Sequence, residues 1–239
     1  MAGHSKWAKI KRDKGANDAK RGAIFTRIGK QIAIAARKGT DPSMNPALAL
    51  AIEKAKAANM PNSNIQRAID RVNDKNAAAL EEITYEAYGP GGAGLIIEAA
   101  TDNRNRTLPE IKTALVKNGG QIADSGSVMF QFMRRGVIRV DSTGEETLLT
   151  VLDAGAEDAN EEENEIIVYT NQKDLAKVRQ SIIDAGLKVI EAELQYIANN
   201  EVEINDSEVA RKMIKLMDVL DEVDDIVNVY TNADITVEL

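Results

Sequence analysis

The spacing of apolar residues changes near residue 80, and this change constrains the fold more than any other feature of the sequence. Before it, apolar side chains recur every three or four residues, the period of an amphipathic helix. After Glu82, short runs rich in Val, Ile and Tyr alternate with helical segments, which is typical of mixed helix and sheet structure. A chain of 239 residues is long enough for two or three modules, each with its own core.

The first predicted helix begins at Asn17 or Asp18 and stops at Gly39. Helical spacing divides it into two faces. The apolar face consists of Ile24, Phe25, Ile28 and Ile32. The opposite, basic face consists of Lys20, Arg27, Lys30, Arg37 and Lys38.

Two further helices are predicted before residue 80. The second has Asn45 as its N-cap and Pro46 at its first position, a favourable start for a helix. The third follows Pro61 and is capped by Asn62 or Ser63. Its expected buried face consists of Ile65, Ala68, Ile69 and Val72. Together the three helices form a bundle, and the polar segment "NDKNAAALEE" joins it to the rest of the chain.

The remaining sequence predicts strands and helices in alternation. "ITYEAY" and "GLIIEAA" flank "GPGG" as a hairpin, and a helix over 107–117 and a strand at "SVMFQF" follow. "GVIRV", "EIIVYT" and "KVIEAELQYI" are further strands, with helices over 145–154 and 173–185 between them. "EVEI", a helix over 207–220 and "IVNVYTN" close the chain. This last set is too small to fold alone, so it must complete an earlier sheet.

We therefore predict a multidomain α and α+β fold with three domains. Residues 1–79 form a three-helix domain. Residues 80–133 and 200–239 form one α+β domain, and residues 134–199 form another that is inserted into it. Both sheet domains are expected to be ferredoxin-like.

Composition narrows the functional classes. The sequence contains no cysteine, which excludes disulfides, thiolate metal sites and a cysteine nucleophile. No apolar run reaches the length of about 18 residues that a membrane span needs, and charged residues occupy the start, where a signal peptide would be apolar. The expected location is the cytoplasm, without membrane insertion or export.

Basic and acidic residues are separated along the chain. Residues 1–75 contain 16 Lys or Arg and 6 Asp or Glu, a net charge of +10. The remainder contains 14 basic and 32 acidic residues, a net charge of −18. Such a division is typical of a module that binds a polyanion, attached to acidic domains. The alternative is a solvated face that happens to be basic.

The opening of the chain carries the predicted nucleic-acid contacts. Lysine and arginine displace counterions from phosphates, and an indole can stack on a base. The candidate residues are Lys6, Trp7, Lys9, Lys11, Arg12, Lys14, Lys20, Arg21, Arg27 and Lys30. Two alternatives remain open: a basic tail whose Trp7 packs on the bundle, and a mitochondrial presequence.

The segment "TDNRNRTLPE" contains the helix-starting pattern Thr107-x-x-Glu110, with Pro109 in the first turn. This pattern places Arg104 and Arg106 just before a helix N-terminus. Cations are unfavourable there unless an anion compensates them. The two arginines are therefore a candidate anion or RNA contact; the alternative is pairing with Asp102, Glu98 or Glu110.

Other motifs favour structural explanations. "YGPGGAG" lacks the Lys-Ser or Lys-Thr of a phosphate loop, so a hairpin turn with positive φ explains its glycines. "EDANEEENE" and "DVLDEVDD" lack calcium-loop spacing and are expected to be a surface loop and solvated faces. His4 has no ligand or catalytic partner nearby in the sequence. We predict no metal, no cofactor and no enzymatic activity. The alternative is an enzyme that binds a phosphorylated substrate through "GPGG", Arg104 and Arg106.

Nine segments, in order, resemble the YebC family, which includes the mitochondrial translational activator of cytochrome c oxidase. They are "MAGHSKWAKIK", "DAKRG", "IFTRIGKQI", "AIEKAKAANMP", "YGPGG", "TDNRNRT", "NGG", "GSV" and "VNVYTN". The resemblance covers essentially the full chain. It implies an N-terminal helical domain and two α+β domains, the third inserted into the second.

The resemblance also implies a nucleic-acid role. Bacterial members are named probable transcriptional regulators that bind DNA, whereas the mitochondrial relatives and some bacterial ones look like translation factors on ribosomes. The sequence departs from the family at Asp13, where a basic residue is usual, and at Phe130, where Trp is common. We expect a non-catalytic regulator of gene expression that binds DNA or ribosomal RNA. RNA is slightly favoured because no helix-turn-helix reading helix or dimer signature is evident.

Overall fold

The structure is a computed structural model that describes residues 18–74 and 79–237, with side chains described from residue 22 onward. The chain forms two compact units. The first comprises Met1–Phe132 and Ala198–Leu239, and the second comprises Met133–Ile197. The second unit is thus inserted into the first along the sequence, where residues 134–199 were expected to form an insertion.

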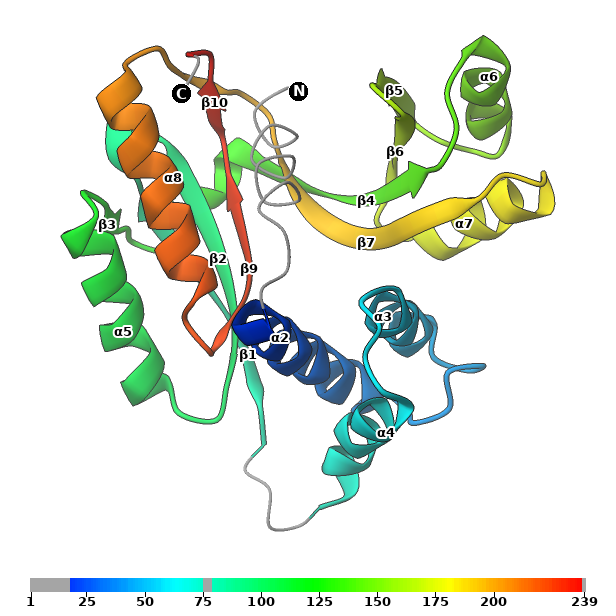
Figure 1. Ribbon diagram of the computed structural model, residues 1–239, viewed down its shortest axis with the longest axis horizontal. Helices are drawn as coiled ribbons and strands as arrows, with labels where there is room; N and C mark the ends of the chain where they lie inside the picture. Colours follow the sequence, from blue (N-terminus) through cyan, green and yellow to red (C-terminus); the bar gives the residue numbers. More distant parts are fainter. Residues whose placement is uncertain (1–17, 75–78, 238–239) are drawn as a thin grey trace. The chain divides into compact units, whose positions relative to one another are not determined.

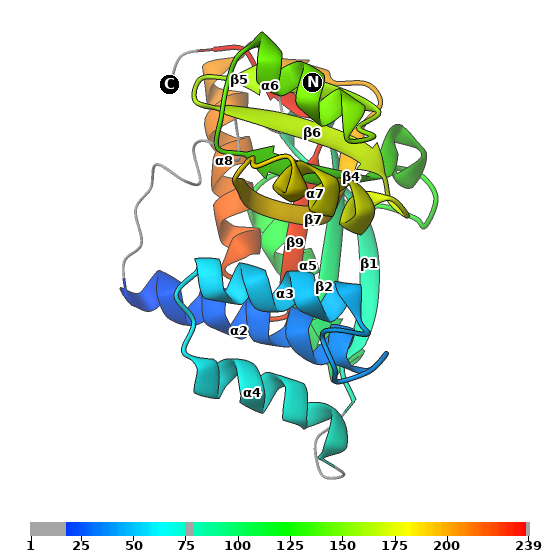
Figure 2. The same ribbon diagram turned by 90° about the vertical axis from the view of Figure 1, so that its right-hand side faces the viewer.

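Three helices at the start of the first unit enclose a small aliphatic core. They are α2 (Asp18–Ala36), α3 (Pro46–Ala57) and α4 (Asn62–Asp70), and the short 3-10 helix η1 (Arg71–Asn73) follows. Helix α2 contacts both α3 and α4 (Figure 2). The buried core residues are Ile28, Ile32, Ala36, Leu48, Ala55, Met60, Ile65 and Ile69.

Local signals explain where these helices begin and end. Asn45 caps α3 by accepting a hydrogen bond from the backbone N–H of Leu48 at 3.2 Å, as predicted. The predicted cap of α4 is wrong, because α4 starts at Asn62 behind Pro61 and has no side-chain cap. Val72 and Ile24 were expected to be buried, yet each is 38% exposed. Helix α4 ends at Asp70, so Val72 lies in η1 and leaves the buried stripe.

A four-stranded antiparallel sheet follows in the order β3-β1-β2-β9. Its strands are β1 (Glu81–Tyr88), β2 (Gly94–Thr101), β3 (Gln121–Ile122) and β9 (Ile226–Thr231). Helices α5 (Arg104–Lys117) and α8 (Ser207–Asp221) cover one face of this sheet (Figure 1). Strands β8 (Val202–Ile204) and β10 (Ala233–Ile235) pair in parallel beside it. The predicted hairpin is confirmed: β1 and β2 pair along their whole length around η2 (Pro90–Gly92).

The strand predicted at "SVMFQF" is wrong. Met129–Gln131 form the 3-10 helix η3, and strand β4 begins only at Phe132. The edge position beside β1 is taken by β3 instead. The carboxylate of Glu86 binds the backbone N–H groups of Val128 and Met129, so these groups do not pair with a neighbouring strand.

The second unit has its own antiparallel sheet, in the order β5-β6-β4-β7. Its strands are β4 (Phe132–Val140), β5 (Asp158–Glu162), β6 (Glu165–Asn171) and β7 (Val189–Ala198), with helices α6 (Glu145–Asp153) and α7 (Leu175–Asp184). "EDANEEENE" was expected to be a surface loop, but Asp158–Glu162 pair with β6 as a strand. Four of these five residues are partly buried, Asp158 and Glu162 among them, so the high charge of the segment concealed the strand. The described residues therefore form a mixture of α-helices, two four-stranded antiparallel sheets and one parallel pair of short strands.

Candidate nucleic-acid interface

The ten residues predicted to contact nucleic acid divide into three groups. Six of them, Lys6, Trp7, Lys9, Lys11, Arg12 and Lys14, lie outside the described residues. Lys20 and Arg21 belong to helix α2, but their side chains are not described. Arg27 and Lys30, also in α2, have described side chains, and both are paired with carboxylates.

Cations on the basic face of α2, and Arg37 just after it, bond other segments of the first unit: the end of α8, the turn that follows it, and the residue before β1. Arg27 bonds both the backbone oxygen and the carboxylate of Asp221, with 3.4 Å between its Nη1 and Oδ1. The Lys30 Nζ lies 2.6 Å from the Asp225 Oδ1 and 2.8 Å from the backbone oxygen of Asp224. Arg37 donates to the backbone oxygen of Leu80 at 2.6 Å. Three of the five cations expected on this face therefore bind the chain itself.

Asp225 is the centre of these contacts. Its side chain is 3% exposed, and it follows α8 in the turn that leads to β9. Oδ1 accepts from Lys30, while Oδ2 accepts from Arg106 at 2.7 Å, Thr107 at 2.7 Å and Thr101 at 3.0 Å. We call these four donors, from α2, β2 and α5, the Asp225 cage.

The cage favours the ionised carboxylate. Burial alone would raise the pKa of Asp225, but hydrogen bonds from Lys30, Arg106 and Thr107 outweigh it and hold the pKa far below its usual value. Asp225 is therefore ionised at neutral pH. "DVLDEVDD" was expected to be a solvated run, and for Asp225 this is wrong.

The predicted start of α5 is also wrong. The helix begins at Arg104, and the side chain of Asn103 caps it by accepting from the Arg106 N–H at 3.2 Å. Thr107 does not serve as a cap, because its hydroxyl bonds Asp225 and Thr101 inside the cage. Arg104 and Arg106 thus lie in the first turn of the helix rather than before it.

The two arginines face different surroundings. Arg106 bonds the buried Asp225 and also lies 3.2 Å from Asp102, although 48% of its side chain is exposed. Arg104 pairs with Glu81 at 2.7 Å, and both side chains are more than half exposed. The charge needed at this helix N-terminus is thus supplied by carboxylates of the chain.

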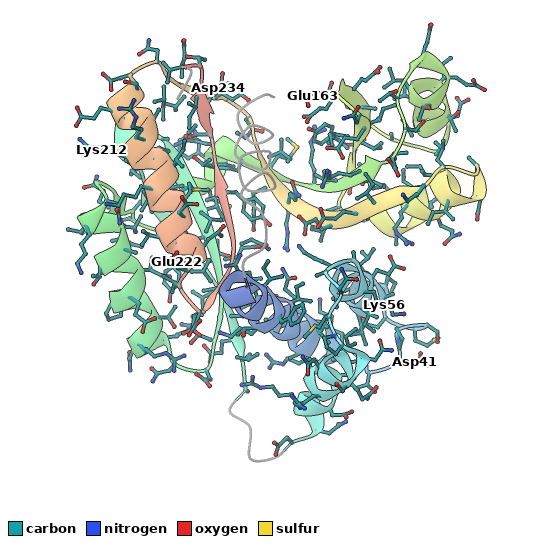
Figure 3. The ribbon with its side chains drawn as sticks, in the orientation of Figure 1. Asp41, Lys56, Glu163, Lys212, Glu222 and Asp234 are labelled. Atoms are coloured by element: carbon teal, nitrogen blue, oxygen red, sulfur yellow. The ribbon has the colours of Figure 1, made fainter. Side chains whose placement is uncertain are left out.

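Three other cations of the helical region point to solvent. Lys38, Lys56 and Arg67 are exposed, and none of them pairs with a carboxylate among the described residues. Lys56 lies on α3 and is labelled in Figure 3. These side chains can approach a phosphate backbone without breaking an ion pair.

The "GPGG" loop serves as the hairpin turn. Gly91 and Gly92 have φ of 75° and 79°, which confirms the predicted need for positive φ. The loop also packs closely on α8: a Cβ on Gly91 would lie 3.1 Å from a methyl group of Val209, and one on Gly89 would lie 2.9 Å from the sulfur of Met213. Close packing and turn geometry together explain these glycines.

Glu86 is a buried carboxylate that the sequence did not indicate. It is 7% exposed and accepts backbone N–H groups from Gly126 at 2.6 Å and from Val128 and Met129 at 2.7 Å each. Burial opposes its ionisation, yet the three hydrogen bonds lower its pKa. Glu86 thereby shapes the "GSV" loop that leads into η3, where the side chain of Phe130 is 71% exposed.

Neither a metal site nor a membrane span emerges from the described part of the chain. No group of three or more His, Asp or Glu residues there is placed to hold a metal ion. No helix there is long and apolar enough to cross a bilayer.

Comparison with known proteins places the chain in a family. Residues 5–75 match the TACO1/YebC protein N-terminal domain, and residues 80–233 match the TACO1/YebC second and third domain. A protein of Halothermothrix orenii is 46% identical over all of this chain and 97% of its own length. A protein of Roseiflexus castenholzii is 48% identical, again over all of this chain and 97% of its own length. Both are named "Probable transcriptional regulatory protein".

A solved structure agrees with this placement. The crystal structure of a conserved hypothetical protein, Aq1575, from Aquifex aeolicus is similar to this chain with a TM-score of 0.86 and 39% sequence identity. The similarity covers 93% of each chain. The resemblance seen in the sequence motifs is therefore confirmed, and the chain belongs to the TACO1/YebC family.

Proposed function

We propose that this protein is a non-catalytic regulator of gene expression that binds nucleic acid through its basic N-terminal region. The observation that carries this proposal is the division of charge: residues 1–75 hold 16 basic and 6 acidic residues, whereas the rest is strongly acidic. Phosphate binding by lysine and arginine releases condensed counterions and supplies most of the non-specific affinity for nucleic acid. The regulatory names of the bacterial relatives support the same role.

The proposed interface has an opening arm and a helical surface. The arm contains Lys6, Trp7, Lys9, Lys11, Arg12 and Lys14 and continues into Lys20 and Arg21. The exposed cations Lys38, Lys56 and Arg67 extend it over the helical region. Arg104 can join it, because its ion pair with Glu81 is solvent-exposed and exchanges at little cost. Arg27 and Lys30 contribute only if their bonds to Asp221 and Asp225 open.

We favour RNA, and in particular ribosomal RNA, over a DNA operator. An arm of cations around a single Trp suits unpaired bases, on which an indole can stack.

We further propose that the three helices form the first domain and that each four-stranded sheet lies in a ferredoxin-like domain, the third domain being inserted into the second. The acidic domains would then face solvent or protein, since phosphates repel them.

Ultraviolet crosslinking in cells tests the proposal. A tagged full-length protein is crosslinked, purified under denaturing conditions, and its bound nucleic acid is sequenced. We expect ribosomal RNA, joined to peptides from residues 1–75. Recovery of promoter DNA would shift the assignment to transcription, and recovery of no nucleic acid above an untagged control would refute it.

The alternative class, an enzyme acting on a phosphorylated substrate, has a separate test. A thermal-shift screen with nucleotides and sugar phosphates reports any ligand that binds the folded state. We expect no stabilisation. A shift abolished by Arg104→Ala would support the enzymatic alternative instead.

A further inference from the structure

The contact between α2 and the turn after α8 withdraws four charged side chains from solvent. The side chains of Lys30 and Asp225 are 11% and 3% exposed, and those of Arg27 and Asp221 are 15% and 16% exposed. Surface ion pairs contribute little because water competes with them. These two pairs are shielded from water, so they hold α2 in one position against the turn that follows α8.

The Asp225 cage has the composition of a phosphate site. Its donors are an ammonium, a guanidinium and two hydroxyls, and they meet at the first turn of α5, where the helix macrodipole also favours an anion. The anion in this site is a carboxylate of the same chain. Donors suited to a phosphate are therefore already satisfied inside the protein.

The cage also joins segments that are distant in the sequence. Lys30 lies 195 positions from Asp225, and Arg106 lies 119 positions from it. The backbone oxygen of Asp225 accepts from the N–H of Ala100 at 2.8 Å, which fixes the turn to β2. The turn is thus anchored to the sheet on one side and binds α2 on the other.

We propose that Asp225 is a positioning residue for nucleic-acid binding: it fixes the direction of α2 relative to the first sheet, and it withholds Lys30 directly, and Arg27 by keeping α2 beside Asp221, from nucleic acid. This inference rests on the proposed function. Lys20 and Arg21 lie in α2 itself, so the direction of α2 sets where this part of the proposed interface lies. Asp225 carries this role rather than Asp221 because it is the more deeply buried and has four donors.

The adjacent Asp224 provides a matched control. Its side chain is exposed, and only its backbone oxygen bonds Lys30. Asp224→Asn and Asp225→Asn therefore remove the same charge from neighbouring positions, but only the second disturbs the cage. A difference between the two variants reports the cage rather than net charge.

Distance measurement tests the positioning directly. The natural sequence contains no cysteine, so Met44→Cys and Val116→Cys introduce two specific sites for spin labels. Both positions are exposed, at 82% and 70%, and they lie after α2 and on α5. We expect a single narrow distance distribution in the otherwise wild-type protein and in Asp224→Asn, and a broadened one in Asp225→Asn. Equal widths in all three would overturn the proposal.

A binding titration tests the withholding of cations. The probe is a fluorescent single-stranded oligouridylate of about 20 nucleotides, titrated over a range of salt concentrations. Release of Lys30 alone, or of Lys30 with Arg27, should steepen the log–log salt slope of Asp225→Asn by about 0.7 to 1.4. Asp224→Asn should keep the wild-type slope. A merely structural residue would lower stability without changing this slope, so an unchanged slope in Asp225→Asn would overturn this part.

Two further results keep the tests separable. If Asp225→Asn does not fold, Lys30→Gln opens the same contact from α2 and leaves Arg106 and Thr107 on Asp225. A narrow distance distribution in Lys30→Gln would then refute the positioning role. If the wild-type protein does not bind the probe, the proposed function fails, while the distance measurement still decides whether Asp225 fixes α2.

Discussion

Replacing Glu86 tests whether one buried carboxylate shapes the loop after β3. Glu86→Ala removes the acceptor of three backbone N–H groups, those of Gly126, Val128 and Met129. Leaving a buried donor without a partner costs about 1–3 kcal/mol, and an exposed one less. Val128 is buried, Met129 is partly buried and Gly126 is exposed. About 1 kcal/mol for each group predicts a loss of about 3 kcal/mol in the free energy of unfolding.

The loss should be visible in both urea and thermal unfolding. For a unit of about 170 residues, 1 kcal/mol shifts Tm by about 2–4 °C, so we expect a decrease of about 6–12 °C. Glu82→Ala is the matched control, because Glu82 is an exposed carboxylate on the same strand. Circular dichroism follows the first unit's transition in each variant.

The pH dependence has a defined sign. Because the pKa of Glu86 is lowered in the folded protein, its ionised form adds stability above the unfolded pKa of about 4.3. This contribution is lost as the pH falls through the folded value. The stability difference between the wild type and Glu86→Gln should therefore shrink as the pH is lowered below about 4.3. Equal stability of Glu86→Ala and Glu82→Ala at neutral pH would refute the reasoning.

Three further predictions concern two arginines, two glycines and Trp7. Arg106→Ala should lower Tm clearly more than Arg104→Ala in thermal unfolding, because only Arg106 bonds the buried Asp225; equal shifts would contradict the described cage. Gly91→Ala should destabilise by about 1–2 kcal/mol, because its φ is 75° and Val209 is close. Gly22→Ala, with open space around it in α2, should instead raise the free energy of unfolding in urea by about 0.5–1 kcal/mol. If Gly91→Ala proved more stable than Gly22→Ala, the "GPGG" turn would tolerate a side chain. Trp7→Ala should weaken single-stranded RNA binding by about 1–3 kcal/mol in a fluorescence titration while leaving the salt slope unchanged; unaltered affinity would show that Trp7 does not stack.

Features set by adjacent residues were predictable from the sequence. Asn45 followed by Pro46 marks the start of α3, and the glycines of "GPGG" between alternating apolar runs mark the hairpin of β1 and β2. In each case the signal is a residue whose own backbone preference or side-chain bond decides the local structure. No information from distant parts of the chain is needed.

Features set by distant partners were not predictable. "SVMFQF" has the composition of a strand, but Glu86, forty positions earlier, takes the N–H groups of Gly126, Val128 and Met129. Thr107 and Glu110 fit a capping pattern, yet the Thr107 hydroxyl is committed to Asp225. A buried carboxylate with a distant cationic partner cannot be distinguished, in one sequence, from an exposed carboxylate in an acidic run.

The same limit explains the basic face of α2. Its charges were identified correctly, but their role was expected to be contact with an external polyanion. In the structure Arg27 and Lys30 bond Asp221 and Asp225, which lie about 195 positions away in the sequence. The charge pattern shows which side chains can bind an anion. Only the fold shows whether that anion is a carboxylate of the same chain.

The most direct test of the proposed nucleic-acid role is the salt dependence of RNA binding by the intact protein with and without its basic opening. Lys6, Lys9, Lys11 and Lys14 are replaced together by alanine, and affinity for single-stranded RNA is titrated at several salt concentrations. Each lost phosphate contact removes about 0.7 from the log–log slope, so the slope should fall by roughly 2 to 3. Wild-type slope and affinity in the fourfold variant would contradict the claim that the opening of this chain binds phosphates.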